Sequence, residues 1–233
     1  MFKLNLKKIA YSAFVFLIIL GAISAASHYL PQPSTEVVME FNPPPGKEWF
    51  LEQRPQYDAH PMSEFLHIIP AVLFLLIIPF QLSKRLRQSK PRLHRYLGRS
   101  FVLLGLVMGL AGLYIGLVYP FAGIKESIFV VPFSVLFLFS LYKGFVYARQ
   151  KRFDLHKKWM FVSVAVGFTP VTMRFIFSPY IFFTGISGRE VFVETMVIGL
   201  LVNLVVLRLY WSKQQNRSRL GKLSSNILSD KQA

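Results

Sequence analysis

Two short basic segments each carry a histidine at the start of an apolar stretch: "HRYLGR" begins at His94, and "HKKWM" begins at His156. Neutral imidazole is a common ligand of haem iron, so two such residues on adjacent helices suit axial ligation. Arg95 and Arg99 follow His94, where their guanidinium groups would meet haem propionates. Contact of the histidines with lipid phosphate is the plainer interpretation, and quinone or anion binding and proton relay also stay open.

A second set of ionisable residues lies within the apolar stretches. Glu64 precedes His67 at helical spacing, and Arg174 and Glu194 lie in the last two stretches. At a rise of about 1.5 Å per residue, His67, Arg174 and Glu194 are expected at similar depth in the membrane. Charges inside a bilayer cost about 2.5–3.5 kcal/mol each on insertion scales, so they usually pair within the bundle. We expect an Arg174–Glu194 ion pair, which either fixes helix packing alone or builds an outer pocket that includes His67.

The composition is that of an integral membrane protein. Of 233 residues, 53% are hydrophobic, and several apolar runs reach the roughly 20 residues that cross a bilayer. The net charge of +16 comes from basic residues clustered between these runs, which is typical of positive-inside topology. We therefore expect the lipid bilayer as partner and no nucleic acid. The chain has no cysteine, which excludes iron–sulfur and thiolate metal sites, and no other metal site is predicted.

The apolar runs predict an all-α, polytopic membrane bundle of six transmembrane helices. The helices are expected within residues 1–30 and at about 63–83, 99–119, 127–147, 158–183 and 190–211. The first is an N-terminal anchor helix, with a signal peptide as the alternative. Residues 31–62 predict an extracytoplasmic loop, and residues 212–233 predict a basic, mobile cytoplasmic tail. Every basic connection falls on one side, so both termini are expected in the cytoplasm.

The chain also aligns with itself at an offset of 62 residues without a gap. The matched pairs include Glu64 with Glu126, Pro70 with Pro132, His94 with His156 and Gly105 with Gly167. Both units would run in the same direction through the membrane, so we predict a parallel two-hairpin repeat. Its units are about 64–119 and 126–183, within a five-helix membrane domain at 63–211. Phe129 takes the position of His67, so an outer site would not be duplicated.

Four glycines follow one face of the third predicted helix: Gly105, Gly109, Gly112 and Gly116. Such a stripe favours close helix–helix approach over a flat cofactor in the groove. The sequence contains no phosphate-binding glycine loop with its lysine and no G-x-S-x-G or H-E-x-x-H motif. These absences disfavour an ATP-driven pump or a hydrolase.

The two histidine segments, a histidine-bearing preceding helix and a membrane-embedded arginine together resemble a known family. That family comprises uncharacterised bacterial membrane proteins of unknown function, marked by H-R-x-x-G-R and a downstream H-x-x-W-M. The resemblance covers about residues 63 to 211. It implies a multi-pass protein of the bacterial cytoplasmic (inner) membrane and supplies no activity.

Two classes of function stay open, and the sequence does not decide whether the protein is an enzyme. The first is haem- or quinone-linked electron transfer through His94, His156 and His67, with b-type haem as the candidate cofactor. The second is a non-redox protein that binds or transports a small hydrophobic molecule or lipid, or an accessory subunit of a larger membrane complex. In that case the ligand would lie where the repeats meet.

Overall fold

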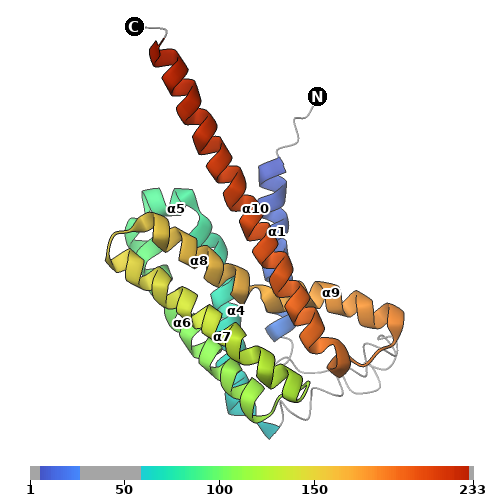
Figure 1. Cartoon of the computed structure of the whole chain (residues 1–233). Coiled ribbons are helices and arrows are strands. Elements are labelled where there is room, and N and C mark those ends of the chain that lie inside the picture. The colour runs from blue at the N-terminus through green and yellow to red at the C-terminus, as the bar shows by residue number, and fades with distance from the viewer. Residues whose placement is uncertain (1–5, 27–58, 231–233) are drawn as a thin grey trace.

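The computed structural model describes residues 6–26 and 59–230, with side chains at residues 11–23, 59–177, 179–180 and 183–216. These residues form helices and no strand (Figure 1). The helices are α1 (Leu6–Ala26), α4 (Pro61–Leu82), α5 (Lys84–Ser89), α6 (Pro91–Val118), α7 (Ile124–Arg149), α8 (Phe153–Gly167), α9 (Thr169–Thr184) and α10 (Gly188–Asp230). Most of the predicted loop at 31–62 lies outside the described residues.

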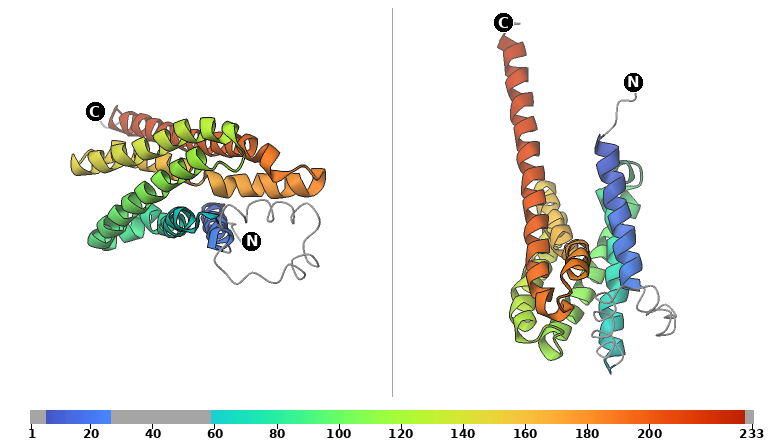
Figure 2. Two further views of the ribbon diagram at one scale, coloured as in Figure 1. Left: turned by 90° about the horizontal axis from the view of Figure 1, so that it is seen from below. Right: turned by 90° about the vertical axis from the view of Figure 1, so that its right-hand side faces the viewer.

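Five segments of the described chain are long and apolar enough to cross a membrane: α4, α6, α7, α10 and the combined segment α8–α9. In α1, the described apolar stretch Tyr11–Ile23 is shorter than these segments. The structure therefore confirms an all-α membrane bundle with five of the expected spans, and the sixth stays a prediction. The N-terminal end of α1 and the C-terminal end of α10 lie toward the same end of the bundle as α5 (Figures 1 and 2).

The basic connection between the second and third predicted helices is itself helical, which corrects the expected start of the third helix at about residue 99. Ser83 caps α5 by accepting the Leu86 N–H at 3.2 Å. Pro91 then occupies the first position of α6, where a missing N–H costs nothing. The arginines and leucines between them are good helix formers. His94 and its basic neighbours therefore lie on the first turns of α6.

The predicted mobile tail is also helical, because α10 continues to Asp230 (Figure 1). Residues 212–230 contain no proline and a single glycine, and nine of these 19 residues are lysine, arginine, glutamine or leucine. These residue types sustain a helix beyond the apolar stretch.

The fifth predicted helix is broken into α8 and α9 at Phe168 (Figure 1). Pro170 is the second residue of α9 and lacks the N–H that would continue the ladder of α8. Thr169 bonds through its hydroxyl to the carbonyl of Ala165 at 3.3 Å, and Asn203 of α10 donates to the same carbonyl at 3.0 Å. Side chains thus satisfy a carbonyl at the break, and α9 leaves the line of α8.

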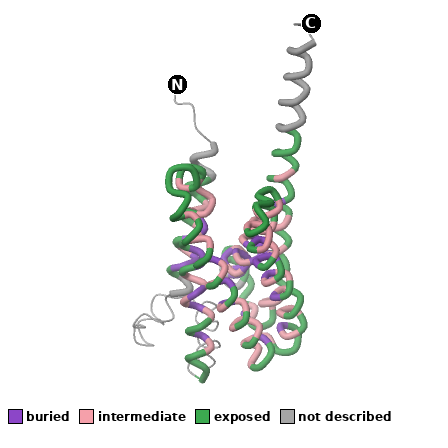
Figure 3. Tube along the Cα trace, turned by 90° about the vertical axis from the view of Figure 1, so that its left-hand side faces the viewer, coloured by how far each residue is buried: buried purple, intermediate pink, exposed green. Residues whose placement is uncertain are grey.

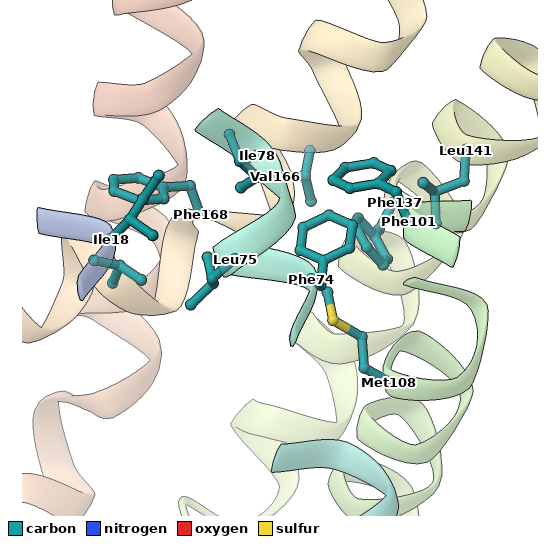
Figure 4. Packing of buried hydrophobic residues seen from close by; sticks show 11 residues of the cluster. Ile18, Phe74, Leu75, Ile78, Phe101, Met108, Phe137, Leu141, Val166 and Phe168 are labelled. Atoms are coloured by element: carbon teal, nitrogen blue, oxygen red, sulfur yellow. The ribbon is translucent and has the colours of Figure 1, made fainter. Parts of the chain in front are cut away.

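The helices pack as two hairpins with flanking elements. The helix α4 packs against α6, α7 against α8, and α6 against α7, while α1 lies on α4 and α10 lies on α9 and α8. Buried residues concentrate where these elements cross (Figure 3). The central ring is Phe74 of α4, fully buried between Phe101 of α6 at 4.0 Å and Phe137 of α7 at 5.7 Å between ring centroids (Figure 4). Ile18 of α1 belongs to the same core cluster.

Candidate functional site

A cavity of about 230 Å³ lies between the two hairpins, in the half of the bundle that contains the N-terminal ends of α4 and α7. Its walls are mainly apolar, with aromatic residues from several helices, including Phe129, Phe133 and Phe137. Four ionisable residues also line it: Glu64, His67, Glu126 and Arg174. An apolar pocket with a few convergent polar groups is the usual form of a small-molecule site.

The two carboxyl groups come from equivalent positions near the start of α4 and α7. Glu64 is 7% exposed and Glu126 is 9% exposed, and the two lie within electrostatic range of each other. The Glu126 Oε2 accepts the backbone N–H of Ala122 at 2.8 Å, just before its own helix. The Glu64 side chain lines the cavity as well.

His67 is held by the helix opposite it. Its Nδ1 donates to the carbonyl of Met108 at 2.9 Å, because a carbonyl can only accept. The ring rests on Gly112 of α6, where a Cβ would come within 2.8 Å of the ring Cε1. The predicted glycine stripe thus permits close approach, here by an imidazole. With Nδ1 engaged, Nε2 is the nitrogen left for a molecule in the cavity.

Arg174 enters the same cavity from α9, beyond the break. Its Nη1 donates to the carbonyl of Pro170 at 3.0 Å, one helical turn earlier. It lies within electrostatic range of His67. The structure therefore brings together three of the residues singled out in the sequence, Glu64, His67 and Arg174, and adds Glu126.

Glu194 lies outside this cavity, and its pairing with Arg174 stays a prediction. Its Oε1 accepts from Lys125 Nζ at 3.3 Å, and both side chains are more than half exposed. Glu194 is absent from the cavity lining. The direction in which α10 presents Glu194 depends on packing that the residue spacing does not encode.

The cavity lining repeats the sequence offset of 62. Eight pairs with one residue from each hairpin are separated by this number: Glu64 and Glu126, His67 and Phe129, Ile68 and Val130, Ala71 and Phe133, Leu75 and Phe137, Met108 and Pro170, Gly109 and Val171, and Gly112 and Arg174. Corresponding positions of the two hairpins thus face the same space. Glu126 was aligned with Glu64 in the sequence and could have been named as a site residue on that signal.

The histidines at the other end lie apart from the cavity. His156 Nδ1 donates to the carbonyl of Gly144 on α7 at 2.8 Å. His94 lies within electrostatic range of His156, Arg87 and Arg95. Arg95 and Arg99 are exposed on α6. None of the four residues proposed as a haem site, His94, His156, Arg95 and Arg99, lines the cavity. Among the described residues there is also no group of three or more carboxylate or histidine side chains that could hold a metal ion.

Comparison with known proteins assigns the chain to a family through its membrane-spanning residues. A family model described as "Predicted membrane protein (DUF2306)" matches residues 64–211, which span α4 to the apolar part of α10 and include every ionisable residue of the cavity. Neither the curated proteins nor the solved structures give a match. The chain belongs to the DUF2306 family of predicted membrane proteins, whose function is unknown.

Proposed function

We propose that this membrane protein binds a small, partly apolar molecule in the cavity between its two hairpins. The observation that carries this proposal is the convergence of Glu64, His67, Glu126 and Arg174, from three helices, on one space with aromatic walls. Buried ionisable residues in a membrane span are costly and mark ligand or ion pathways. At about 230 Å³, the cavity is below the roughly 300–1,000 Å³ of pockets for drug-sized ligands, which favours a molecule of about one ring.

The repeat predicted from the sequence supports the same location. We propose that α4–α6 and α7–α9 derive from one duplicated hairpin, related by an axis along the membrane normal. The eight lining pairs at the offset of 62 support this proposal. Ligand sites in repeat-containing membrane proteins commonly lie where the repeats meet. With the basic connections in the cytoplasm of a bacterial inner-membrane protein, the cavity would lie in the outer half of the bilayer.

The binding proposal can be tested by filling the cavity. Ala71 lines it, whereas Leu73 on the same helix is 45% exposed on the outside of the bundle. Ala71→Phe places a ring inside the cavity, and Leu73→Phe places a ring outside it. Small molecules extracted from each purified variant would be compared by mass spectrometry. We expect a species that copurifies with the native protein and with Leu73→Phe and is lost from Ala71→Phe. The same extract from all three would contradict the proposal.

Haem-linked electron transfer through His94 and His156 is a second candidate. It is supported by the proximity of the two residues and by the hydrogen bond from His156 Nδ1 to the Gly144 carbonyl. This bond leaves Nε2 of His156 available as an axial ligand of the iron. An absorption spectrum of protein expressed with haem supplied, before and after dithionite, tests it. A Soret band that disappears in both His94→Ala and His156→Ala is the expected result of bis-histidine ligation. Colourless protein would remove this candidate without affecting the binding proposal.

A further inference from the structure

The polar groups of the cavity are divided between its two halves. Each hairpin supplies one carboxyl at the equivalent position, Glu64 from α4 and Glu126 from α7. The other two groups are also split: His67 belongs to the first half and Arg174 to the second. A ligand between the hairpins would therefore meet hydrogen-bonding groups from both sides rather than at one pole.

These groups offer both acceptors and donors. Carboxylates and the Nε2 of His67 accept, because Nδ1 of that ring already donates to Met108. The guanidinium of Arg174 only donates. The cavity can thus receive ligand hydroxyl groups at the carboxylates and a ligand carbonyl at Arg174. A molecule whose oxygens are hydroxyl groups in the reduced form and carbonyl groups in the oxidised form would be accommodated in both forms.

The walls favour a flat ring. Phe129, Phe133 and Phe137 line one side, and aromatic side chains pack against a ring by offset stacking or edge contact. Gly109 and Gly112 of α6 also line the cavity, and they give the neighbouring rings of Phe137 and His67 room to pack against this helix. All the lining helices are membrane-spanning candidates or pack on them, so a ligand that reaches the cavity from the bilayer must itself be largely apolar.

We propose, on the basis of the binding function above, that the cavity takes the head group of a quinol or quinone. This is a single six-membered ring with oxygens at opposite edges, one for each of the two carboxyl groups that the hairpins supply. Glu64 and Glu126 each receive one quinol hydroxyl. The carbonyl of the quinone form is received by Arg174. The proposal concerns binding and assigns no electron-transfer step.

Three compounds with the same methylated ring and different numbers of hydroxyl groups show how much the hydroxyl groups add to the binding of the apolar ring. They are tetramethyl-1,4-benzoquinol kept reduced with dithionite, 2,3,5,6-tetramethylphenol and 1,2,4,5-tetramethylbenzene. Affinities would be taken from thermal-shift titrations of the delipidated full-length protein at fixed detergent concentration. A charge-assisted hydrogen bond is worth about a tenfold change in affinity or more. We expect the phenol to bind about tenfold more weakly than the quinol, and the hydrocarbon about 100-fold more weakly.

Matched variants test the two-edge arrangement. Glu64→Gln and Glu126→Gln should each weaken quinol binding by about tenfold and leave hydrocarbon binding unchanged. Glu194→Gln is the control, because this carboxylate pairs with Lys125 outside the cavity. A loss in only one of the two cavity variants would overturn the two-edge arrangement.

The outcomes also distinguish the two proposals. Equal affinity for all three compounds would overturn the quinol assignment and leave a cavity that binds small molecules. If none of the compounds bound, and Ala71→Phe yielded the same extract as the native protein, both proposals would be overturned. If a compound of another class copurified and was lost from Ala71→Phe, only the quinol assignment would be overturned.

Discussion

The two hairpins place corresponding residues around one cavity, yet their second helices follow different paths. In the first hairpin α6 runs unbroken from Pro91 to Val118, whereas in the second the chain breaks at Phe168 between α8 and α9. Met108 and Pro170 occupy the same position at the offset of 62. Methionine keeps its N–H and the helix continues, while proline has none and the helix breaks. The missing N–H of Pro170 is thus one cause of the different paths.

The same comparison shows how two different polar groups share one framework. The carbonyl of Met108 accepts from His67, and the carbonyl of Pro170 accepts from Arg174. Gly112 gives the His67 ring its space on α6, and Arg174 itself stands at the equivalent place in the second hairpin. The two halves therefore hold a ring nitrogen and a guanidinium at the same level. Two hairpins with matching positions can differ in this way through the side chains that face the cavity.

The largest effect is expected at Phe74, which both hairpins share. A Cβ on Gly105 would come within 3.2 Å of its ring, and a Cβ on Gly167 within 2.9 Å. Phe74→Ala opens a void between the hairpins and should lower the free energy of unfolding by about 3 kcal/mol. The measurement is titration with sodium dodecyl sulfate in mild detergent. Phe80→Ala is the control, since this residue is 55% exposed on the same helix. Equal losses in both variants would show that the hairpins do not depend on a common core.

A smaller effect is expected where α10 supports the break in the second hairpin. Asn203 donates to the carbonyl of Ala165 at 3.0 Å and accepts from Thr172 Oγ1 at 2.8 Å. Asn203→Leu removes both bonds and should lower the free energy of unfolding by about 1 kcal/mol. Thr172→Val removes only one of them and should cost about half as much. Val202→Leu, on the exposed side of α10, is the control. No difference between Asn203→Leu and this control would mean that Pro170 alone holds the break.

Apolar length and charge distribution predicted the helical bundle and five of its spans, because both follow directly from the bilayer's thickness and its electrostatic asymmetry. The same reasoning missed the start of α6 and the length of α10. Basic residues were taken as signs of a loop, although lysine and arginine are good helix formers outside the membrane. The break before Pro170 also involves Asn203, which bonds to the Ala165 carbonyl from a position far away in the sequence.

The site was predicted in part for a similar reason. Glu64, His67 and Arg174 were identified because ionisable residues in apolar stretches must face the interior. Glu194 was assigned to the same pocket on depth alone. Its partner, Lys125, is set by how α10 lies against the start of α7, and helix rotation of this kind comes from packing.

His94 and His156, which correspond at the offset of 62, provide a third comparison between the two hairpins. His156 Nδ1 donates to Gly144 at 2.8 Å, whereas His94 Nδ1 is buried and, within the described chain, has no hydrogen-bond partner. His156→Phe should therefore lower the free energy of unfolding by about 0.6 kcal/mol. His94→Phe removes a buried polar atom without breaking a side-chain bond and should be neutral or slightly stabilising. Detergent unfolding of the two variants, side by side, measures the difference. Equal losses would mean that both rings are held alike.

The smallest effect concerns the contact between the second hairpin and α10 at the surface. Lys125 Nζ and Glu194 Oε1 are 3.3 Å apart, with side chains 68% and 51% exposed, so solvent screens most of their attraction. A double-mutant cycle with Lys125→Ala and Glu194→Ala should give a coupling of about 0.3 kcal/mol, reduced further by salt. The corresponding cycle between Arg174→Ala and Glu194→Ala should give no measurable coupling. A coupling of about 1 kcal/mol in that second cycle would support the ion pair first inferred from the sequence. It would also move Glu194 into the cavity, and the symmetric placement of Glu64 and Glu126 would then be only one part of a larger charged site.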